Sequence, residues 1–66
     1  MNLTVNGNTK LFQDIKTVTD LLITLNLEPE TVVVEHNTTI IQPGSFDSAH
    51  LAEGDQVEII RFVGGG

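Results

Sequence analysis

Apolar and polar residues alternate over residues 1–6, with the apolar residues at odd positions. A period of two predicts a strand with one buried face. The pair Asn6-Gly7 follows and favours a tight hairpin, because both turn positions need positive φ. A second strand is therefore expected over about residues 9–15, where only one of the adjacent Leu11 and Phe12 can point inward.

The apolar spacing changes after Thr17. Thr17 and Asp20, three residues later, resemble a capping box at the start of a helix. Four apolar residues then follow the helical spacing i, i+3, i+4 and i+7: Val18, Leu21, Leu22 and Leu25. We expect a helix of two to three turns that packs this stripe on a sheet. Asn26 is expected to adopt the left-handed conformation at its end, because Pro29 prevents continuation.

Two short apolar runs then predict a second pair of strands. Residues 31–35 are mostly β-branched, which is typical of a strand. A turn over residues 36–38 leads to a short return strand that begins at Ile40 and Ile41. Pro43-Gly44 is expected to end that strand.

The last third of the chain predicts a helical turn, a tight turn and a final strand. Residues 46–51 are expected to form one irregular helical turn with Phe46 and Leu51 buried. A tight turn over residues 53–55 leads into residues 57–63, the most apolar strand, which we place at the centre of the sheet beside the first strand. The order of elements predicts an α+β fold, a mixed sheet of four to five strands with one main helix on one face.

Composition narrows the class of protein. Sixty-six residues form one domain, and without cysteine neither a disulfide nor a thiolate metal site can form. No positively charged segment precedes an apolar run, so we expect no signal peptide, and no stretch approaches the ~20 apolar residues of a membrane span. The predicted location is the cytoplasm.

The chain is acidic, with three Lys and Arg against nine Asp and Glu and a formal net charge of −6. Such a surface repels polyanions, which argues against nucleic acid and anionic membranes as partners. It would attract a basic surface of a protein, although acidity can also serve solubility alone.

The candidate chemistry lies at the carboxyl end. Residues 1–63 are expected to form the folded domain and residues 64–66 a flexible glycine tail. Glycine has no Cβ, so such a tail can enter a slot too narrow for a side chain. Gly66 would end in an unhindered carboxylate, which becomes an acyl donor only after activation by a partner. The alternative is that the glycines are a linker remnant or a frayed end.

The side chains beside the tail predict a contact surface. If Val57 and Ile59 point toward the helix, then Glu58, Ile60 and Phe62 point away from it. Exposed apolar groups beside a reactive end indicate a partner-binding surface. The alternative is that Phe62 folds over the edge of the sheet as local packing.

Other polar residues predict no catalytic or metal site. His36 is expected in a turn and His50 at the surface, and Asp47, three residues before His50, does not complete the three ligands that a metal needs. Glu53 and Asp55 are expected to be solvated charges at turns. We therefore predict no bound metal, no bound cofactor and no catalytic residue.

Taken together, these motifs resemble the ubiquitin-like β-grasp fold and, within it, the ThiS family of sulfur carriers. The resemblance covers nearly the whole chain. It depends on the following segments in this order: Asn6-Gly7, Thr17-Val18 before Asp20-Leu21-Leu22, Val34 to Asn37, Ile40-Ile41, Leu51 before Gly54-Asp55, and Phe62 to Gly66.

The resemblance implies a function. In this family a ThiF-like adenylating enzyme uses ATP to adenylate the final glycine, which here would be Gly66. A persulfide donor of the cysteine desulfurase or rhodanese type then supplies sulfur, and a ThiG-like thiazole synthase takes it from the thiocarboxylate for thiamine biosynthesis. Gly65 would be the slim neighbour in the enzyme's channel, and Gly64 would lengthen the tether.

Two alternatives stay open at this point. The small subunit of molybdopterin synthase also carries a terminal thiocarboxylate but is usually longer. A non-covalent ubiquitin-like interaction module would leave the glycines without a role.

Overall fold

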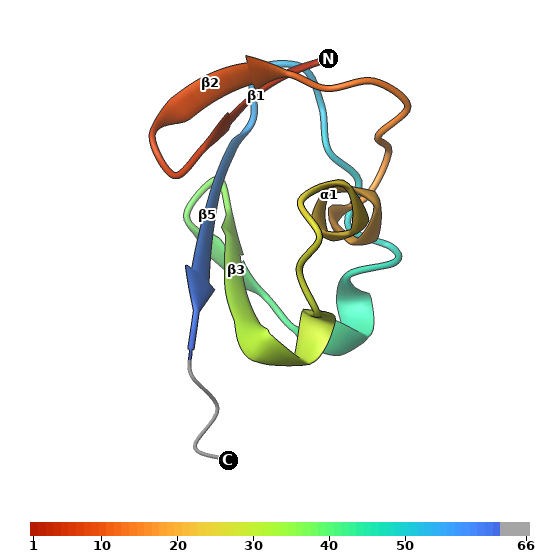
Figure 1. Cartoon of the computed structure of the whole chain (residues 1–66), viewed down its shortest axis with the longest axis vertical. Helices are drawn as coiled ribbons and strands as arrows, with labels where there is room; N and C mark the ends of the chain where they lie inside the picture. Colours follow the sequence, from red (N-terminus) through yellow and green to blue (C-terminus); the bar gives the residue numbers. More distant parts are fainter. Residues whose placement is uncertain (63–66) are drawn as a thin grey trace.

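The computed structural model describes residues 1–62, which form a mixed five-stranded sheet with one α-helix packed on one face (Figure 1). The predicted α+β fold is confirmed. The elements, in chain order, are β1 (Asn2–Val5), β2 (Asn8–Leu11), α1 (Val18–Thr24), the 3₁₀ helix η1 (Pro29–Thr31), β3 (Val32–His36), β4 (Thr39–Ile41), the 3₁₀ helix η2 (Pro43–Ser45) and β5 (Gln56–Arg61).

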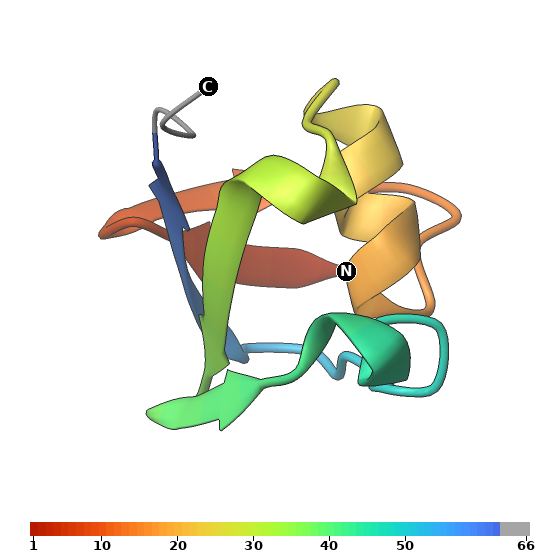
Figure 2. The same cartoon turned by 90° about the horizontal axis from the view of Figure 1, so that it is seen from below.

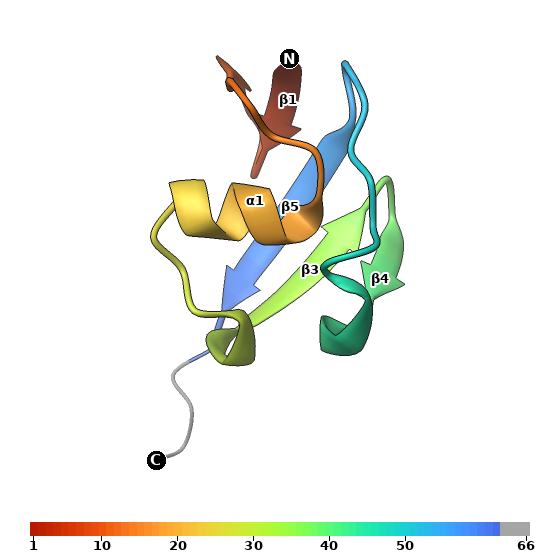
Figure 3. The ribbon, with the colours of Figure 1, turned by 90° about the vertical axis from the view of Figure 1, so that its right-hand side faces the viewer.

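The strand order is β2-β1-β5-β3-β4, so the last strand of the chain is the central one, as predicted. β5 runs parallel to β1 and antiparallel to β3. Figure 3 shows α1 in front of the sheet and β4 beside β3 at its outer edge. In the sequence, the segment from β2 through β4 therefore separates β1 from β5, which pair with each other in the sheet.

The first hairpin is as predicted, but its second strand is shorter. Asn6 and Gly7 have φ of 50° and 83°, which fits the turn that their sequence favours. The expected strand over residues 9–15 is wrong beyond Leu11. β1 begins at Asn2, so the last backbone bond of this pair is donated by the Phe12 N–H to the Met1 carbonyl, at 2.8 Å.

The start of α1 is fixed by the predicted capping box, with Asp in place of the preferred Glu or Gln. The Asp20 N–H donates to Thr17 Oγ1, and Asp20 Oδ2 accepts from the N–H groups of Lys16 and Thr17 at 2.8 and 3.1 Å. These backbone donors, Lys16 first, lower the pKa of the Asp20 carboxyl. The ionised carboxylate thus holds the first turn in place.

The end of α1 is also as predicted. Asn26 has a φ of 62°, and its N–H donates to the Ile23 carbonyl at 3.0 Å. The N–H of Leu27 donates to the Leu22 carbonyl at 2.9 Å, and Leu27 packs against the core. These two hydrogen bonds, together with a left-handed residue between the helix and the apolar contact, form a Schellman motif.

The core lies between α1 and the inner face of the sheet, and Figure 2 shows α1 and both 3₁₀ helices on the same side of β3 and β5. Within residues 1–62 no helix lies over the other side of these two strands. The buried apolar side chains are Leu3, Phe12, Ile15, Val18, Leu21, Leu22, Val32, Val34, Phe46, Leu51, Val57 and Ile59. Phe12 rather than Leu11 is therefore the inward residue of that pair.

The helical turn expected over residues 46–51 is misplaced, although Phe46 and Leu51 are buried as predicted. The 3₁₀ helix η2 begins at Pro43, whose fixed φ suits a helical start. Hydrogen-bonded turns continue to Ala49, whose N–H donates to the Ser45 carbonyl at 2.9 Å, and the Leu51 N–H then donates to the carbonyl of Lys16 at 2.8 Å.

The remaining turns and strand limits differ from prediction by one or two residues. The turn between β3 and β4 consists of Asn37 and Thr38, both with positive φ, so His36 belongs to the strand. Gly54 has a φ of 84°, as the predicted tight turn requires.

No helix within residues 1–62 is long and apolar enough to cross a membrane.

Candidate functional site

β5 carries the chain to the end of the molecule farthest from Met1 (Figure 1). Its last backbone contact is donated by the Phe62 N–H to the carbonyl of Thr31, at 3.0 Å. Thr31 is itself held in η1, where its N–H donates to the Glu28 carbonyl at 3.1 Å. The chain is thus anchored up to Phe62, and the predicted tail, Gly64 to Gly66, lies outside the described residues.

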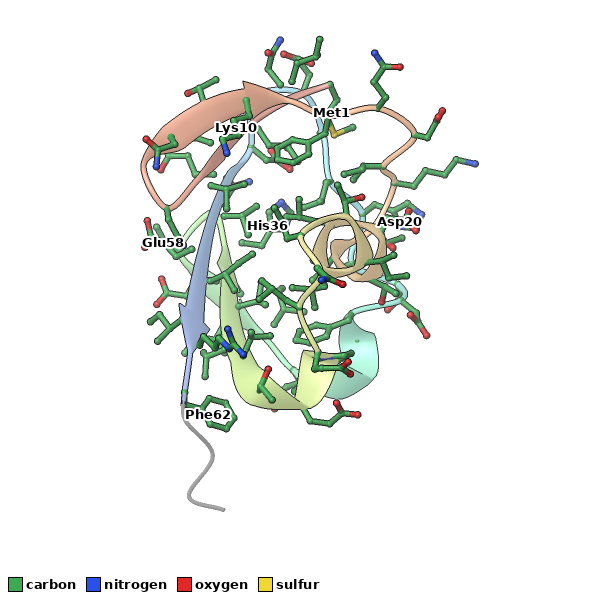
Figure 4. All side chains as sticks on the ribbon, in the orientation of Figure 1. Met1, Lys10, Asp20, His36, Glu58 and Phe62 are labelled. Carbon is green, nitrogen blue, oxygen red and sulfur yellow. The ribbon has the colours of Figure 1, made fainter. Side chains whose placement is uncertain are left out.

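The three side chains predicted to point away from the core are exposed. Val57 and Ile59 are buried, whereas Glu58 is exposed and Ile60 and Phe62 keep 54% and 44% of their surface accessible. Figure 4 places Glu58 beside β5 on the side away from α1 and Phe62 at the end of the strand. Glu58 and Ile60 are exposed on the outer side of β5, as predicted, whereas Figure 4 draws the Phe62 ring at the end of the strand on the side of α1. The role of these residues in partner binding stays a prediction.

The structure adds three residues that the sequence reasoning did not assign to this surface. Val33 lies opposite Ile60, and Glu35 lies between Glu58 on β5 and Ile40 on β4. We define the open-face patch as the residues on the outer side of β3, β4 and β5, namely Val33, Glu35, Ile40, Glu58 and Ile60. The alternation within each run indicates the face, but only the register shows which residues are neighbours.

The two histidines lie away from this patch. His36 is the last residue of β3 rather than a turn residue, and its Nε2 lies 2.6 Å from Asp55 Oδ2. His50 is exposed, as predicted, with Nδ1 at 3.0 Å from the Ser48 carbonyl. Asp47 instead accepts a hydrogen bond from the Thr19 hydroxyl.

Asp55 is not simply a solvated charge, because it connects two turns. Burial raises the pKa of its carboxyl, but hydrogen bonds from the side chains of His36 and Asn37 and from the Ala52 N–H outweigh burial and lower it. Asn37 also accepts from the Gln56 N–H at 2.8 Å. This cluster joins the β3–β4 turn to the start of β5, which is a structural role.

Glu53 also has a structural role that the sequence reasoning missed. Its carboxylate accepts from the backbone N–H and the side chain of Asn2, at 2.8 and 3.0 Å. The backbone donor, followed by the side-chain donor, lowers the pKa of Glu53. The bond fixes the turn before β5 to the start of β1.

Within the described residues, neither a metal-ligand cluster nor the groove given below involves Glu58, Ile60 or Phe62. Among residues 1–62, no three His, Asp or Glu side chains lie close enough to hold a metal. A groove of about 310 Å³ lies between the first hairpin and the end of α1, lined by Phe12, Leu25 and neighbouring residues. None of Glu58, Ile60 and Phe62 lines that groove.

A central β5 parallel to β1, with one helix across the sheet, defines a ubiquitin-like β-grasp domain. The family model described as "ThiS family" matches residues 3–66, and the chain belongs to this family.

Two kinds of relative are similar in sequence. The chain is 40% identical over 65 residues to the sulfur carrier protein ThiS of Bacillus subtilis, which covers 97% of this chain and 98% of that protein. It is also 35% and 36% identical over 66 residues to the thiazole synthases of Magnetococcus marinus and Paramagnetospirillum magneticum. The chain spans only 20% of the length of each of these thiazole synthases.

Solved structures are similar over the whole chain. The crystal structure of the thiamine biosynthesis protein ThiS from Geobacter metallireducens superposes with a TM-score of 0.83 at 39% identity, and covers 100% of both chains. The solution structure of a thiamine biosynthesis protein from the same organism gives a TM-score of 0.81 and covers 100% of this chain and 88% of that one. Both the strand order and the single helix therefore follow the family.

Proposed function

We propose that this chain is a sulfur carrier of thiamine biosynthesis that acts as a protein co-substrate of partner enzymes. The observation that carries the proposal is the match with the Bacillus subtilis sulfur carrier, because it extends over nearly all of both proteins. Family membership over residues 3–66 includes the glycine segment. In this proposal the folded domain presents its carboxyl end to the partner enzymes, and these enzymes recognise the surface of the domain.

The reactive group in this proposal is the carboxylate of Gly66. A carboxylate is a poor electrophile, so a carboxylate oxygen first attacks the α-phosphorus of ATP and releases pyrophosphate. The terminal sulfur of a persulfide then attacks the acyl carbon, and AMP leaves. A thiol reduces the S–S bond of the resulting acyl disulfide, which leaves the thiocarboxylate on Gly66 and a disulfide on the donor side.

The neighbouring residues have supporting roles in the proposal. Gly65 passes through the channel of the adenylating enzyme, where a Cβ would clash, and Gly64 lengthens the tether. Ile60, Phe62 and Glu58 contact the enzyme surface around the entrance to that channel. The exposure of these side chains supports this assignment. The hydrogen bond from the Phe62 N–H to the Thr31 carbonyl also supports it, because it fixes the end of the described chain relative to these side chains.

Three partners follow from the proposal. A ThiF-like enzyme adenylates Gly66 and holds the ATP, so the carrier itself binds no cofactor. A persulfide donor of the cysteine desulfurase or rhodanese type supplies sulfur, and a ThiG-like thiazole synthase consumes it. Similarity to segments of two thiazole synthases supports the last partner. The cytoplasmic location and the absence of nucleic-acid and membrane partners stay predictions.

Intact mass spectrometry tests the proposed function. The 66-residue protein is incubated with ATP and the host's ThiF-like enzyme, with and without a persulfide donor and reducing thiol. We expect an AMP adduct without the donor and exchange of one oxygen for sulfur with it. Transfer of that sulfur to thiazole synthase, and not to the large subunit of molybdopterin synthase, would assign the pathway. An unchanged mass in every reaction would favour the non-covalent interaction module.

A further inference from the structure

The side chain of Asn6, in the first hairpin turn, is bound to β5. Its Oδ1 accepts from the Ile59 N–H at 2.7 Å, and its Nδ2 donates to the Ile59 carbonyl at 3.2 Å. We call these two bonds the Asn6 clamp. The paired residues of β1 and β5 end at Val5 and Val57, and the Asn6 N–H donates to the Val57 carbonyl at 2.9 Å. The Asn6 carboxamide therefore takes the place of the next peptide group of β1.

Asn6 differs from the other asparagines of the chain in the residue that follows it. The remaining four precede Leu or Thr: Asn2, Asn8, Asn26 and Asn37. The backbone nitrogen of the following residue can attack the side-chain carbonyl carbon of an asparagine, and a Cβ on that residue hinders the approach. Gly7 has no Cβ. The pair Asn6-Gly7 thus has the least hindered nucleophile next to an asparagine in this chain.

The attacking group of this pair is accessible, whereas the group under attack is restrained. Asn6 and Gly7 are both exposed, so water and hydroxide reach the turn. Within residues 1–62 the Gly7 N–H donates to no protein acceptor. Both polar atoms of the Asn6 carboxamide, by contrast, are bound to Ile59. The carboxamide must therefore release Ile59 before its Cγ can turn toward the Gly7 nitrogen.

The reaction open to this pair is deamidation. The Gly7 nitrogen loses its proton to hydroxide and forms a bond to Asn6 Cγ, and the bond from Cγ to Nδ2 breaks. The leaving nitrogen takes up a proton and departs as ammonia, which leaves a cyclic succinimide. Water then opens the ring at either carbonyl and gives aspartate or isoaspartate at position 6. Overall one water is consumed and one ammonia is released, with no oxidant, reductant or cofactor.

We propose that Asn6 is a site of spontaneous deamidation that the Asn6 clamp protects in the folded protein, and that deamidation weakens the clamp permanently. Aspartate would keep an oxygen that accepts from the Ile59 N–H, but it would bring a carboxylate oxygen against the Ile59 carbonyl. Isoaspartate would also lengthen the backbone of the two-residue turn. Either product adds a negative charge to a chain whose formal net charge is already −6.

The modification acts on the strand that leads to the carboxyl end. β3 pairs with β5 from Val57 to Arg61 on one side. On the other side of β5, the Asn6 clamp holds Ile59 beyond the last paired residue of β1. Deamidation therefore loosens β5 on the side of β1 while β3 still holds it. We expect a folded but less stable protein.

The first test compares rates of deamidation in the full chain when folded and when unfolded in guanidinium chloride, at the same pH and temperature. Peptide mapping by tandem mass spectrometry locates each replacement of NH₂ by OH, and the other four asparagines are internal controls. We expect Asn6 to react first in the unfolded chain. In the folded chain it should react at least about thirtyfold more slowly, because two hydrogen bonds must open first. Reactions of an opened state follow its population.

Hydrogen exchange of the Ile59 N–H provides an independent readout of the same opening. Asn6 Oδ1 is the acceptor of this N–H, so exchange and deamidation both require the clamp to open. Exchange is measured by NMR on the native chain before and after ageing. The Ile59 N–H should exchange faster in the deamidated chain than in the native chain.

The second test uses a pair of variants with the same change of charge. Asn6→Asp reproduces one product, and Asn8→Asp places the same charge on β2, which pairs with β1 and not with β5. Asn6→Asp should lower the urea midpoint and accelerate exchange of the Ile59 N–H by about tenfold, because the Nδ2 donor is lost. Asn8→Asp should stay close to the native protein in both measurements.

Three results would overturn the inference. Equal rates at Asn6 in the folded and unfolded chains would show that the clamp protects nothing. A rate at Asn6 no higher than at the other asparagines of the unfolded chain would show that Asn6 is not a deamidation site. Equal urea midpoints and equal Ile59 exchange for Asn6→Asp and Asn8→Asp would remove the effect on β5. None of these measurements involves the partner enzymes, so the proposed function is tested separately.

Discussion

On the inner face of β3 and β5, Val34 and Ile59 lie opposite each other and are buried, whereas on the outer face Val33 and Ile60 lie opposite each other and are exposed. The two pairs contain the same two residue types and differ only by one position along each strand. Because strand side chains alternate between faces, this step transfers a pair from the core to solvent. The residue type therefore does not determine whether these side chains are buried. Their even or odd position along the strand does, because it sets the face of the sheet from which they project.

The comparison separates stability from recognition within one pair of strands. Side chains on the inner face contribute to folding, and side chains on the outer face are free to bind a partner at little cost to the fold. A domain of this size has a small margin of stability, so a loss in the core affects the folded population strongly. Substitutions matched in chemistry and placed on opposite faces can test this separation.

The largest effect on stability is expected for core substitutions. Leu21→Ala should lower the free energy of unfolding by about 2–4 kcal/mol, and Val34→Ala somewhat less, through lost burial and the cavity left behind. Val33→Ala removes the same two methyl groups from the outer face and should change it by less than about 0.5 kcal/mol. Urea melts measure the free energy of unfolding of all three variants. Equal losses for Val33→Ala and Val34→Ala would show that the two faces of the sheet do not differ in their contribution to stability.

The next largest effect concerns binding. Ile60→Glu and Phe62→Asp should weaken binding to the ThiF-like enzyme by about tenfold or more, because a charge replaces an apolar contact. The urea midpoint should stay close to the native value, since Ile60 keeps 54% and Phe62 keeps 44% of its surface exposed. Calorimetry with the enzyme and urea melts are run on the same samples. Unfolding of either variant would show that the residue supports the core instead.

A smaller effect is expected at the start of α1. Thr17→Ala removes the hydroxyl that accepts the Asp20 N–H and should lower the free energy of unfolding by about 1 kcal/mol. Thr17→Ser keeps the acceptor and should recover most of the loss. Enzyme binding should not change in either variant, because α1 lies on the opposite side of the sheet from the open-face patch.

The smallest effect is a gradual loss of stability in acid. The folded protein lowers the pKa of Asp20 and Glu53 below their ordinary values of 3.8 and 4.5. Their ionised forms therefore stabilise the fold above those values, and this contribution is lost as the pH falls through the lower folded values. Urea melts between neutral pH and about pH 3 should show a shallower decline for Asp20→Asn and Glu53→Gln than for the native protein. An unchanged slope would mean that these carboxylates do not contribute through their charge.

Local patterns in the sequence predicted the features that depend on neighbouring residues. The Asn6-Gly7 hairpin, the Thr17–Asp20 cap and the left-handed Asn26 each follow from the conformations that these residues favour. The alternation in residues 57–62 also predicted which side chains of β5 face the core. These features need no knowledge of distant contacts.

Features that depend on register or on distant partners could not be predicted in this way. The early end of β2 results from the start of β1, and the bond between Glu53 and Asn2 joins residues far apart in the sequence. The opposition of Glu35 and Glu58 required the alignment of β3 with β5. The alternation therefore predicted the exposed face of β5, but not the opposed pair of carboxylates on β3 and β5.

The role of the carboxyl end is the central claim, and intact mass after loading tests it most directly. Three forms are compared under the same conditions with ATP, the ThiF-like enzyme, a persulfide donor and a reducing thiol: the native chain, the chain amidated at Gly66, and the chain without Gly66. Gly65→Ala serves as a fourth form that keeps the terminal carboxylate but adds a methyl group to the channel. The urea midpoints should be equal, because the glycines lie beyond the last described contact of β5.

We expect full exchange of oxygen for sulfur in the native chain and none in the amidated chain, which has no carboxylate oxygen to attack ATP. Deletion of Gly66 moves the carboxylate back by roughly 3.5 Å, and a displacement of about 1 Å can already cost ~100-fold in rate. Gly65→Ala should load slowly. Sulfur loading of the amidated chain to the native level would contradict the claim that Gly66 is the reactive group.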